Sequence, residues 1–315
     1  MLEVVVWGCR GSMPVALTED RLRQKFLQIL ELSAGKDLKT PSARETFLKG
    51  LSFSQASTYG GRTPCVQVLG GDDIVICDAG TGLHSLGQSL EKNSEPCHFH
   101  IFISHLHYDH IQGFPFFLPA YQPGNVLHFY GCHKDLQTAF EQHQTSPFFP
   151  VPISFMQAEK NFTILEPGQE YSIAGFKVHA MLNDHPGDAY SYRFERDGKA
   201  FVYSTDCEHR EGMQKENYPF LIFFRSADLL LMDAQLSFLD ASLMKQNWGH
   251  SSSIAAVELA VRSGVKHLGL FHHDPTCDDA MLDQFLEDAR CYAAHYKDGE
   301  KLNISMCYDG MQIKL

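Results

Sequence analysis

The chain has 315 residues, 44% hydrophobic and 20% charged, which is a composition typical of a globular protein with a substantial core. Its formal net charge of −12 at pH 7 disfavours a broad binding surface for long nucleic acids. No apolar run approaches the roughly 20 residues of a membrane span, and the nine cysteines contain no Cys-x-x-Cys pair. We therefore expect a cytoplasmic protein with reduced thiols, no disulfide framework and no membrane partner.

The predicted elements are strands, a helix, further strands, and then strands that alternate with helices. A strand over 4–7 is followed by a stretch over 17–57 whose leucines and phenylalanines recur at helical spacing. The glycine-rich turn at 78–82 leads into a helix over 83–91. The further strands predicted are 65–69, 74–77, 99–104, 126–130, 176–182, 190–194, 201–204, 229–232, 267–271, 303–307 and 312–314, and the further helices are 134–142, 252–263 and 278–296. This order predicts an α/β protein with two sheets packed face to face and helices outside, as one domain over 1–315.

The stretch over 17–57 is predicted to be a helical insertion in that domain. It carries seven Lys and Arg against five Asp and Glu, so its charge is about +2 in an otherwise acidic chain. We interpret it as a helical pair packed on the edge of the sheets. A lid over the active site and an element of a homodimer are the alternatives.

The motif with the most chemical content is His105-Leu106-His107-Tyr108-Asp109-His110, directly after the predicted strand 99–104. His105 and His107 leave an extended chain on the same face. Asp109 and His110 follow where the chain can fold back toward the same point. Neutral imidazoles with a carboxylate suit zinc, manganese or iron, so the motif predicts a metal site rather than a histidine-rich surface turn.

Four further places carry the right chemistry at the end of a predicted strand or before a predicted helix. They are His185, Asp206, His250 and the pair His272-His273. A single histidine at a strand end is often a surface or capping residue. Together, however, these residues form a set at the kind of boundary where loops gather into functional sites.

These motifs resemble those of the metallo-β-lactamase-fold hydrolases. The motif over 105–110 is similar to the central motif of that superfamily, and Asp78 in Cys77-Asp78-Ala79-Gly80 to its earlier acidic motif. The phrases over 10–12 (Arg-Gly-Ser) and 59–61 (Tyr-Gly-Gly) resemble the branch that holds ribonuclease Z and the phosphoribosyl cyclic phosphate and cyclic-nucleotide phosphodiesterases. Gly-His-Ser-Ser over 249–252 resembles the His-Ser/Thr segment of this branch.

The resemblance implies a four-layer αββα sandwich with a helical insertion near the N-terminus and a two-metal site at one edge. The implied ligands are His105, His107 and His185 for the first ion, Asp109, His110 and His272 for the second, and Asp206 as a bridge between them. His273 is the alternative to His272. Two divalent ions are implied, with Zn²⁺ expected and Mn²⁺ or Fe²⁺ as alternatives.

The resemblance also implies roles in catalysis. A hydroxide bridging the two metals would attack phosphorus, and Asp109 would orient the water or take its proton. His250 would supply a catalytic imidazole that stabilises developing charge or protonates the leaving oxygen. Asp78 is expected to hold a ligand imidazole through its second nitrogen.

Three residues are weaker candidates for contact with the substrate. Arg10 and Ser12, in the turn after the first strand, are candidates for reaching a substrate phosphate, although closing the turn is an equally good role. His209, three residues past Asp206, is a candidate for lining the pocket, with an exposed surface histidine as the alternative.

The function favoured by these residues is that of a binuclear phosphodiesterase acting on a small cyclic or nucleotide-like phosphodiester. A ribonuclease Z-like endonuclease is the first alternative, but the segment 119–152 contains only Lys134 as a basic residue and is poorly suited to gripping RNA. Hydrolysis of another ester, a lactam or a thioester would use the same kind of metal site. A metal-binding sensor without turnover is disfavoured by the complete ligand set.

Overall fold

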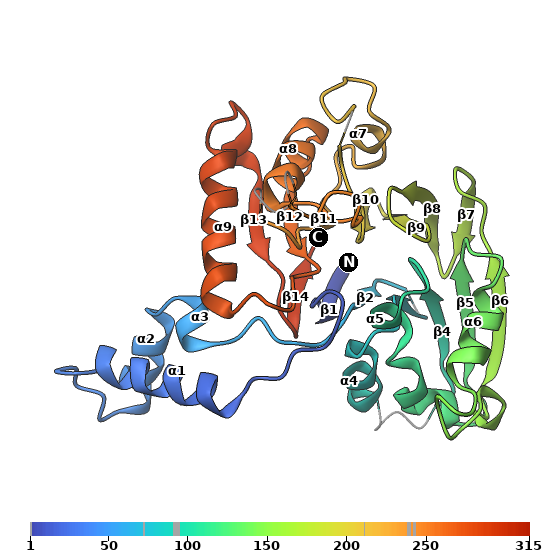
Figure 1. The fold of residues 1–315 in the computed structure, drawn as a ribbon, viewed down its shortest axis with the longest axis horizontal. Coiled ribbons are helices and arrows are strands. Elements are labelled where there is room, and N and C mark those ends of the chain that lie inside the picture. Colours follow the sequence, from blue (N-terminus) through green and yellow to red (C-terminus); the bar gives the residue numbers. More distant parts are fainter. Residues whose placement is uncertain (1, 72, 91–94, 211, 238–240, 242–243) are drawn as a thin grey trace.

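The computed structural model describes residues 2–315 except 72, 91–94, 211, 238–240 and 242–243. Within this part of the chain, the strands form two seven-stranded sheets (Figure 1). In spatial order, the first sheet contains β14 (Met311–Lys314), β1 (Glu3–Gly8), β2 (Cys65–Leu69), β3 (Ile74–Cys77), β4 (His98–Phe102), β5 (Val126–Gly131) and β6 (Glu159–Ile164). The second contains β13 (Asn303–Met306), β12 (His267–Phe271), β11 (Leu229–Asp233), β10 (Lys199–Ser204), β9 (Ala189–Arg196), β8 (Phe176–Asn183) and β7 (Glu170–Ile173).

Helices cover the outer face of each sheet. The helices on the first sheet are α4 (Gly82–Ser89), α5 (Tyr108–Ile111) and α6 (Leu136–His143), and those on the second are α7 (Pro219–Phe223), α8 (Ser253–Ser263) and α9 (Asp279–Ala293). Three more helices, α1 (Glu19–Leu32), α2 (Pro41–Lys49) and α3 (Phe53–Ala56), lie between β1 and β2 in the chain. Among the described residues, no helix has both the length and the apolar character needed to cross a membrane.

The central strands bury both of their faces. On β4, Phe102 points into the core between the sheets, while Phe99 and Ile101 point into the core beneath the outer helices. On β11, Leu231 likewise points into the core between the sheets, and Leu230 into the core beneath the outer helices. This alternation is the period of two expected of a strand, and burial on both faces accounts for the continuous apolar runs in the sequence. The prediction of a four-layer αββα sandwich is confirmed.

Several elements escaped prediction, among them the strands β6 and β7 and the short helices α5 and α7. β6 and β7 lie at the ends of their sheets, and their residues are half-buried or exposed, so they carry little apolar signal. α7 is a short helix that begins at Pro219. The helix predicted over 83–91 is α4, and the last predicted residue lies outside the described residues.

The insertion over 17–57, hereafter the arm, is not packed on the edge of the sheets as predicted. No residue of α1 or α2 is buried, and Figure 1 shows both helices extending away from the two sheets. The base of the arm is held against α9. Lys25 forms a 2.7 Å ion pair with Asp279, and the backbone N–H of Ser54 donates to Asp283.

Candidate metal centre

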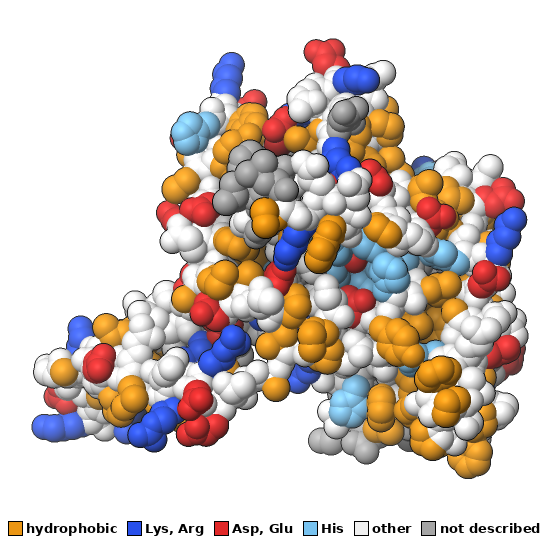
Figure 2. Space-filling model, in the orientation of Figure 1, with side chains coloured by type: hydrophobic (Ala, Val, Ile, Leu, Met, Phe, Trp, Pro, Cys, Tyr) orange, Lys and Arg blue, Asp and Glu red, His pale blue; other side chains and the backbone are white. Residues whose placement is uncertain are grey.

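The predicted site residues gather where strands of both sheets end. His105 and His107 follow β4, His185 follows β8, Asp206 follows β10 and His272 follows β12. Since β10, β11 and β12 run parallel, their carboxyl ends meet at one edge of the second sheet. All of these residues except His107 are buried. Figure 2 shows histidine side chains gathered near the middle of one face of the molecule.

Several residues at this edge have left-handed backbone conformations. The angle φ is +62° at Ser12, +61° at Asp78, +49° at Asp206 and +62° at His272. Such a conformation costs on the order of 1–3 kcal/mol in a residue other than glycine. Strain of this kind persists where surrounding contacts hold it, and it concentrates at functional sites.

The carboxylate of Asp206 faces two separate groups of side chains. Its Oδ1 lies 3.8 Å from His105 Nε2 and 3.9 Å from His185 Nε2. Its Oδ2 lies 3.3 Å from His110 Nε2 and 3.4 Å from His272 Nε2. Burial alone would raise the pKa of this carboxyl, but the imidazoles of His272, His110 and His105 hold it well below its usual range.

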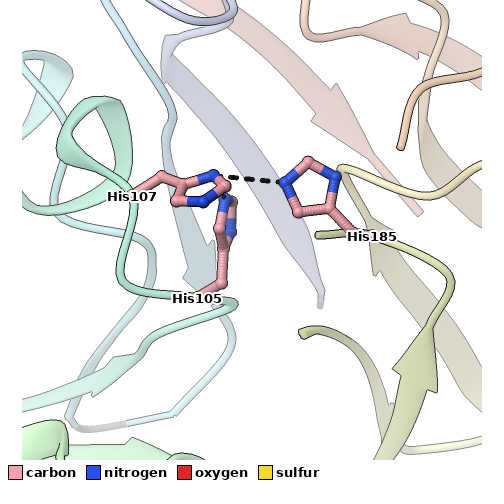
Figure 3. Close-up of side chains that lie close together, drawn as sticks. All are labelled: His105, His107 and His185. Atoms are coloured by element: carbon pink, nitrogen blue, oxygen red, sulfur yellow. Dashed lines mark hydrogen bonds between the residues drawn. The ribbon is translucent and has the colours of Figure 1, made fainter. Parts of the chain in front are cut away.

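The first group is made of three imidazoles that point toward one another (Figure 3). His107 Nδ1 lies 3.0 Å from His105 Nε2 and 3.2 Å from His185 Nε2. His185 donates through Nδ1 to the carbonyl of Gly249 at 2.9 Å, which leaves the lone pair of Nε2 directed at the other two rings. Loss of contact with water, which is only partial at His107, lowers the pKa of all three imidazoles. At His107 the neighbouring His185 ring lowers the pKa further. The three imidazoles are therefore neutral donors suited to a metal ion.

The second group combines a carboxylate with two imidazoles. Asp109 Oδ2 lies 3.2 Å from His110 Nε2 and 3.2 Å from His272 Nε2, and the two histidine atoms are 3.3 Å apart. Burial would lower the pKa of His110, but the carboxylates of Asp109, Asp206 and Asp78 raise it well above its usual value. This part of the site therefore favours positive charge, which a divalent cation would supply.

Asp78 fixes the orientation of this second group from behind. Its Oδ2 accepts from His110 Nδ1 at 2.7 Å, from the hydroxyl of Ser104 at 2.7 Å and from the hydroxyl of Tyr203 at 2.7 Å. Its Oδ1 accepts from the backbone N–H of Ser104 at 2.7 Å. The carboxylate thus directs Nε2 of His110 into the site, which is the arrangement typical of a carboxylate behind a metal-ligating histidine.

Ser12 reaches the site through its backbone. Its N–H donates to Asp109 Oδ2 at 2.8 Å, while its hydroxyl accepts from Gln235 Nε2 at 2.9 Å. Ser12 therefore orients a candidate ligand from the turn after β1.

Three candidates do not face the ligand groups. The guanidinium of Arg10 is buried and donates to the carbonyls of Gly60, Asp274 and Cys277, so the structure does not support contact with a substrate phosphate. His273 donates through Nε2 to the carbonyl of Cys307 at 2.8 Å. Since His273 points away, His272 is the member of the pair that joins the ligand groups.

His209 is neither exposed nor directed at the metal groups. Its Nδ1 lies 2.7 Å from the hydroxyl of Tyr218, and its ring packs edge-on against Phe220. Burial lowers its pKa to about 4. The structure therefore places His209 in an aromatic cluster behind the loop that carries Asp206.

Sequence reasoning missed Asp233, the last residue of β11. Its Oδ2 lies 2.7 Å from His250 Nδ1, and its Oδ1 accepts from the backbone N–H of Ser251 at 3.1 Å. The ring of His250 lies 5.2 Å from that of His185 and 5.1 Å from that of His272, between the two ligand groups. Asp233 could have been found from the sequence, because it is an acidic residue at the end of an apolar strand. Asp78 was identified at the same kind of position.

Burial would lower the pKa of His250, but Asp233 outweighs this effect and raises it to about 9. The imidazole is therefore an acid at neutral pH, held between the two groups of candidate ligands.

Comparison with protein families agrees with this geometry. Residues 74–273 match the family model described as "Beta-lactamase superfamily domain". The chain belongs to this family and is a hydrolase of the metallo-β-lactamase fold, a class that binds divalent metal ions. Within the superfamily, the chain is similar to curated proteins named ribonuclease Z.

Curated relatives include two archaeal proteins named ribonuclease Z. That of Thermoplasma acidophilum is 27% identical over 245 residues, covering 60% of this chain and 73% of the relative. That of Haloarcula marismortui is 24% identical over 317 residues, covering 85% and 96%.

Solved structures share the fold over nearly the whole chain. The metallo-β-lactamase fold protein YhfI from Bacillus subtilis superposes with a TM-score of 0.67 at 18% identity, covering 99% of this chain and 98% of that one. A diphosphatase from the PhnP family gives 0.62 at 17% identity, covering 100% and 98%. Yeast PDE1 gives 0.62 at 14% identity, covering 100% and 99%. At these identities, the likeness establishes the fold.

Proposed function

We propose that this chain is a phosphodiesterase that uses two divalent ions, with Zn²⁺ foremost, and acts on a small cyclic or nucleotide-like phosphodiester. The observation that supports a pair of ions is the position of Asp206, whose two oxygens face different groups of ligands. The proposed ligands are His105, His107 and His185 for one ion, Asp109, His110 and His272 for the other, and Asp206 for both. Bound ions of this kind stabilise charge on phosphoryl oxygens and acidify a water.

The other groups in the site supply positioning and a proton. The carboxylate of Asp109, held by the N–H of Ser12, orients the attacking water. The imidazolium of His250, held by Asp233, donates a proton to the leaving oxygen or stabilises charge on the phosphoryl group. Asp78 keeps His110 in the tautomer that presents Nε2.

A small substrate is supported by the charge of the chain. With a net charge of −12 and only Lys134 as a basic residue over 119–152, the chain offers little electrostatic hold on a long polyanion. Cleavage of RNA is the second candidate, because curated relatives carry the name ribonuclease Z.

Two assays test this proposal. The zinc-loaded protein is expected to hydrolyse bis(p-nitrophenyl) phosphate, and Asp109→Ala to lose this activity. Cyclic mononucleotides, cyclic dinucleotides, cyclic phosphoribose and a precursor tRNA with a 3′ trailer are then compared by kcat/KM. Preference for the tRNA would replace the small-substrate assignment with the ribonuclease assignment. Protein that holds two ions and cleaves no phosphodiester would contradict both.

A further inference from the structure

An exposed tryptophan lies next in the chain to a contact of the candidate metal centre. Trp248 is exposed by 59% and directly precedes Gly249, whose carbonyl accepts from Nδ1 of His185. Figure 2 shows hydrophobic side chains beside the histidines that gather on this face of the molecule. A large aromatic side chain at the rim of a polar site is a common means of recognising a ligand.

The backbone on both sides of Trp248 is held by one buried carboxylate. Oε1 of Glu208 accepts from the N–H of Asn247 at 3.2 Å, and Oε2 accepts from the N–H of Gly249 at 3.0 Å. Glu208 is itself paired with Arg210, whose Nε lies 2.6 Å from Oε1. Asn247 and Gly249 both have left-handed backbone conformations, with φ of +68° and +81°. The backbone of Trp248 is therefore fixed from both sides, although its indole is exposed.

A cation helps to orient the indole. Nζ of Lys245 lies over the ring of Trp248, 5.7 Å from its centroid, and forms a 2.8 Å ion pair with Asp274. The attraction between an ammonium group and the face of an aromatic ring favours this orientation. Because 59% of the tryptophan is still exposed, the indole keeps open aromatic surface on which a planar group can stack.

A second exposed aromatic residue borders the same group of candidate ligands. Tyr108 directly follows His107, is exposed by 61%, and packs edge-on against His143 at 5.3 Å. His107 is the exposed member of its group, so a ligand can reach the metals beside Tyr108. Since His107 lies 3.2 Å from His185, the segments that carry Tyr108 and Trp248 meet at this group. They follow β4 of the first sheet and precede α8 on the second, so aromatic residues from both sheets border the site.

The chemistry of this rim fits a phosphate ester that carries a planar base. Stacking of a base on an aromatic ring needs no positive charge on the protein, which suits a chain of net charge −12. In a mononucleotide, one sugar joins phosphate and base, so a phosphate held at the metals keeps its base nearby. We propose that Trp248 is a specificity-determining residue that stacks the heteroaromatic base of a mononucleotide substrate. This inference rests on the proposed phosphodiesterase function and narrows its substrates to those with a base.

The first test measures stacking by fluorescence. Trp7→Phe removes the other tryptophan of the sequence, so the remaining emission reports on Trp248. Adenosine monophosphate added to the zinc-loaded variant is expected to quench this emission saturably, because its base lies against the indole. Ribose 5-phosphate has the same sugar and phosphate without the base, and it should bind without comparable quenching. Adenosine monophosphate that binds by calorimetry and leaves the emission unchanged would overturn the proposal.

The second test measures affinity by calorimetry in the otherwise unmodified chain. Trp248→Ala should weaken binding of adenosine monophosphate about 10-fold, the size of effect expected for one base on one aromatic ring, and leave binding of ribose 5-phosphate unchanged. Trp248→Phe should keep most of the affinity. Phe155→Ala is the matched control and should bind both ligands like the wild type. Phe155 is a similarly exposed aromatic residue that precedes β6, near the amino ends of the parallel strands and away from the metal centre.

The outcomes separate this inference from the proposed function. Metal content and diester hydrolysis are measured on the same samples. Protein that stacks the base and cleaves no phosphodiester would keep the base site and contradict the proposed function. Protein that cleaves phosphodiesters but binds adenosine monophosphate no more tightly than ribose 5-phosphate would overturn the base site alone. Equal weakening of both ligands by Trp248→Ala would also overturn it, since the residue would then act through His185 rather than on a base.

Discussion

The carboxylate of Asp233 lies 2.7 Å from Nδ1 of His250, at the point where β11 ends between the two groups of candidate metal ligands. Asp233 also accepts from the backbone N–H groups of Ser251 and Gln235, so its own position is fixed. A carboxylate held in this way determines both the orientation and the charge of the imidazole. We therefore treat Asp233 as a positioning residue that acts through His250.

Replacement of Asp233 by Asn should lower kcat about 100-fold, the size of effect expected when a proton donor loses its partner. Metal content should stay at the wild-type value, because Asp233 belongs to neither proposed ligand set. In a double-mutant comparison, Asp233→Asn combined with His250→Ala should be no slower than His250→Ala alone, since the two side chains act as one unit. Steady-state kinetics with metal analysis check this. If the losses in kcat of the two single variants add in the double variant, Asp233 does not act through His250.

Replacement of Asp206 by Ala should disrupt both metal groups at once. Its two oxygens face His105 and His185 on one side and His110 and His272 on the other, so both groups lose the carboxylate that they share. Metal content measured by mass spectrometry should fall from two ions per chain to one or none. Diester hydrolysis should fall about 1,000-fold or more.

Asp184→Ala is the matched control for this variant, because Asp184 is an exposed carboxylate near the same site. It should keep two ions and wild-type activity. If Asp206→Ala also keeps two ions, Asp206 does not bridge them.

In each sheet, the sequence predicted the central strands and one edge strand but missed the other edge strand. Runs such as Leu229–Met232 are buried on both faces and are recognisable from composition alone. β6 and β7 escaped because edge strands keep polar residues on their exposed side. The helical spacing of apolar residues in α1 was also visible, but periodicity says only that a helix has an apolar face and not what lies against it.

The site was predictable where its chemistry is local in the chain. The spacing of the residues over 105–110 is enough to predict a metal site. The role of Asp233 can be inferred only from the structure, because β11 places its carboxylate beside His250. Arg10 shows the opposite case. The turn that carries Arg10 is recognisable in the sequence. The direction of its guanidinium is set by three carbonyls from distant segments, and the sequence around Arg10 does not indicate those contacts.

Gly249→Ala should empty the first metal group selectively. At Gly249 φ is +81°, and a Cβ atom would lie 2.1 Å from Nδ1 of His185, on the ring that must direct Nε2 at His105 and His107. Displacing this ring should reduce metal content by about one ion per chain, because the three atoms nearest to the added Cβ belong to His185 and Pro186 and none to the second group.

Gly198→Ala is the control for Gly249→Ala. Gly198 has a similar φ of +73°, with nothing within 4 Å of an added Cβ, so the variant carries the same backbone strain without a clash. It should lose only about 1 kcal/mol of stability and keep both ions. Equal loss of metal in the two variants would attribute the effect to backbone strain rather than to His185.

Stability should depend on Asp228, which directly precedes β11, whereas Asp233 at the other end of that strand lies in the metal centre. Its carboxylate is buried beneath Lys266 at 2.8 Å and Lys199 at 3.1 Å, and it accepts from the backbone N–H of Ala200 at 2.9 Å. Burial would raise its pKa, but these partners outweigh that effect and lower it below the ordinary value of 3.8. The ionised form is therefore the one that stabilises the fold.

Asp228→Asn should lower the free energy of unfolding by about 1–2 kcal/mol at pH 7, a value limited by solvent screening of the exposed lysines. A carboxyl whose pKa is depressed on folding stabilises the protein fully above its unfolded pKa. The difference between the variant and the wild type should thus be constant from neutral pH to about pH 5 and shrink as the pH falls through 3.8. Urea unfolding at several pH values measures it. Asp197→Asn, at an exposed carboxylate paired with Arg196, should change stability by less than about 0.5 kcal/mol at every pH.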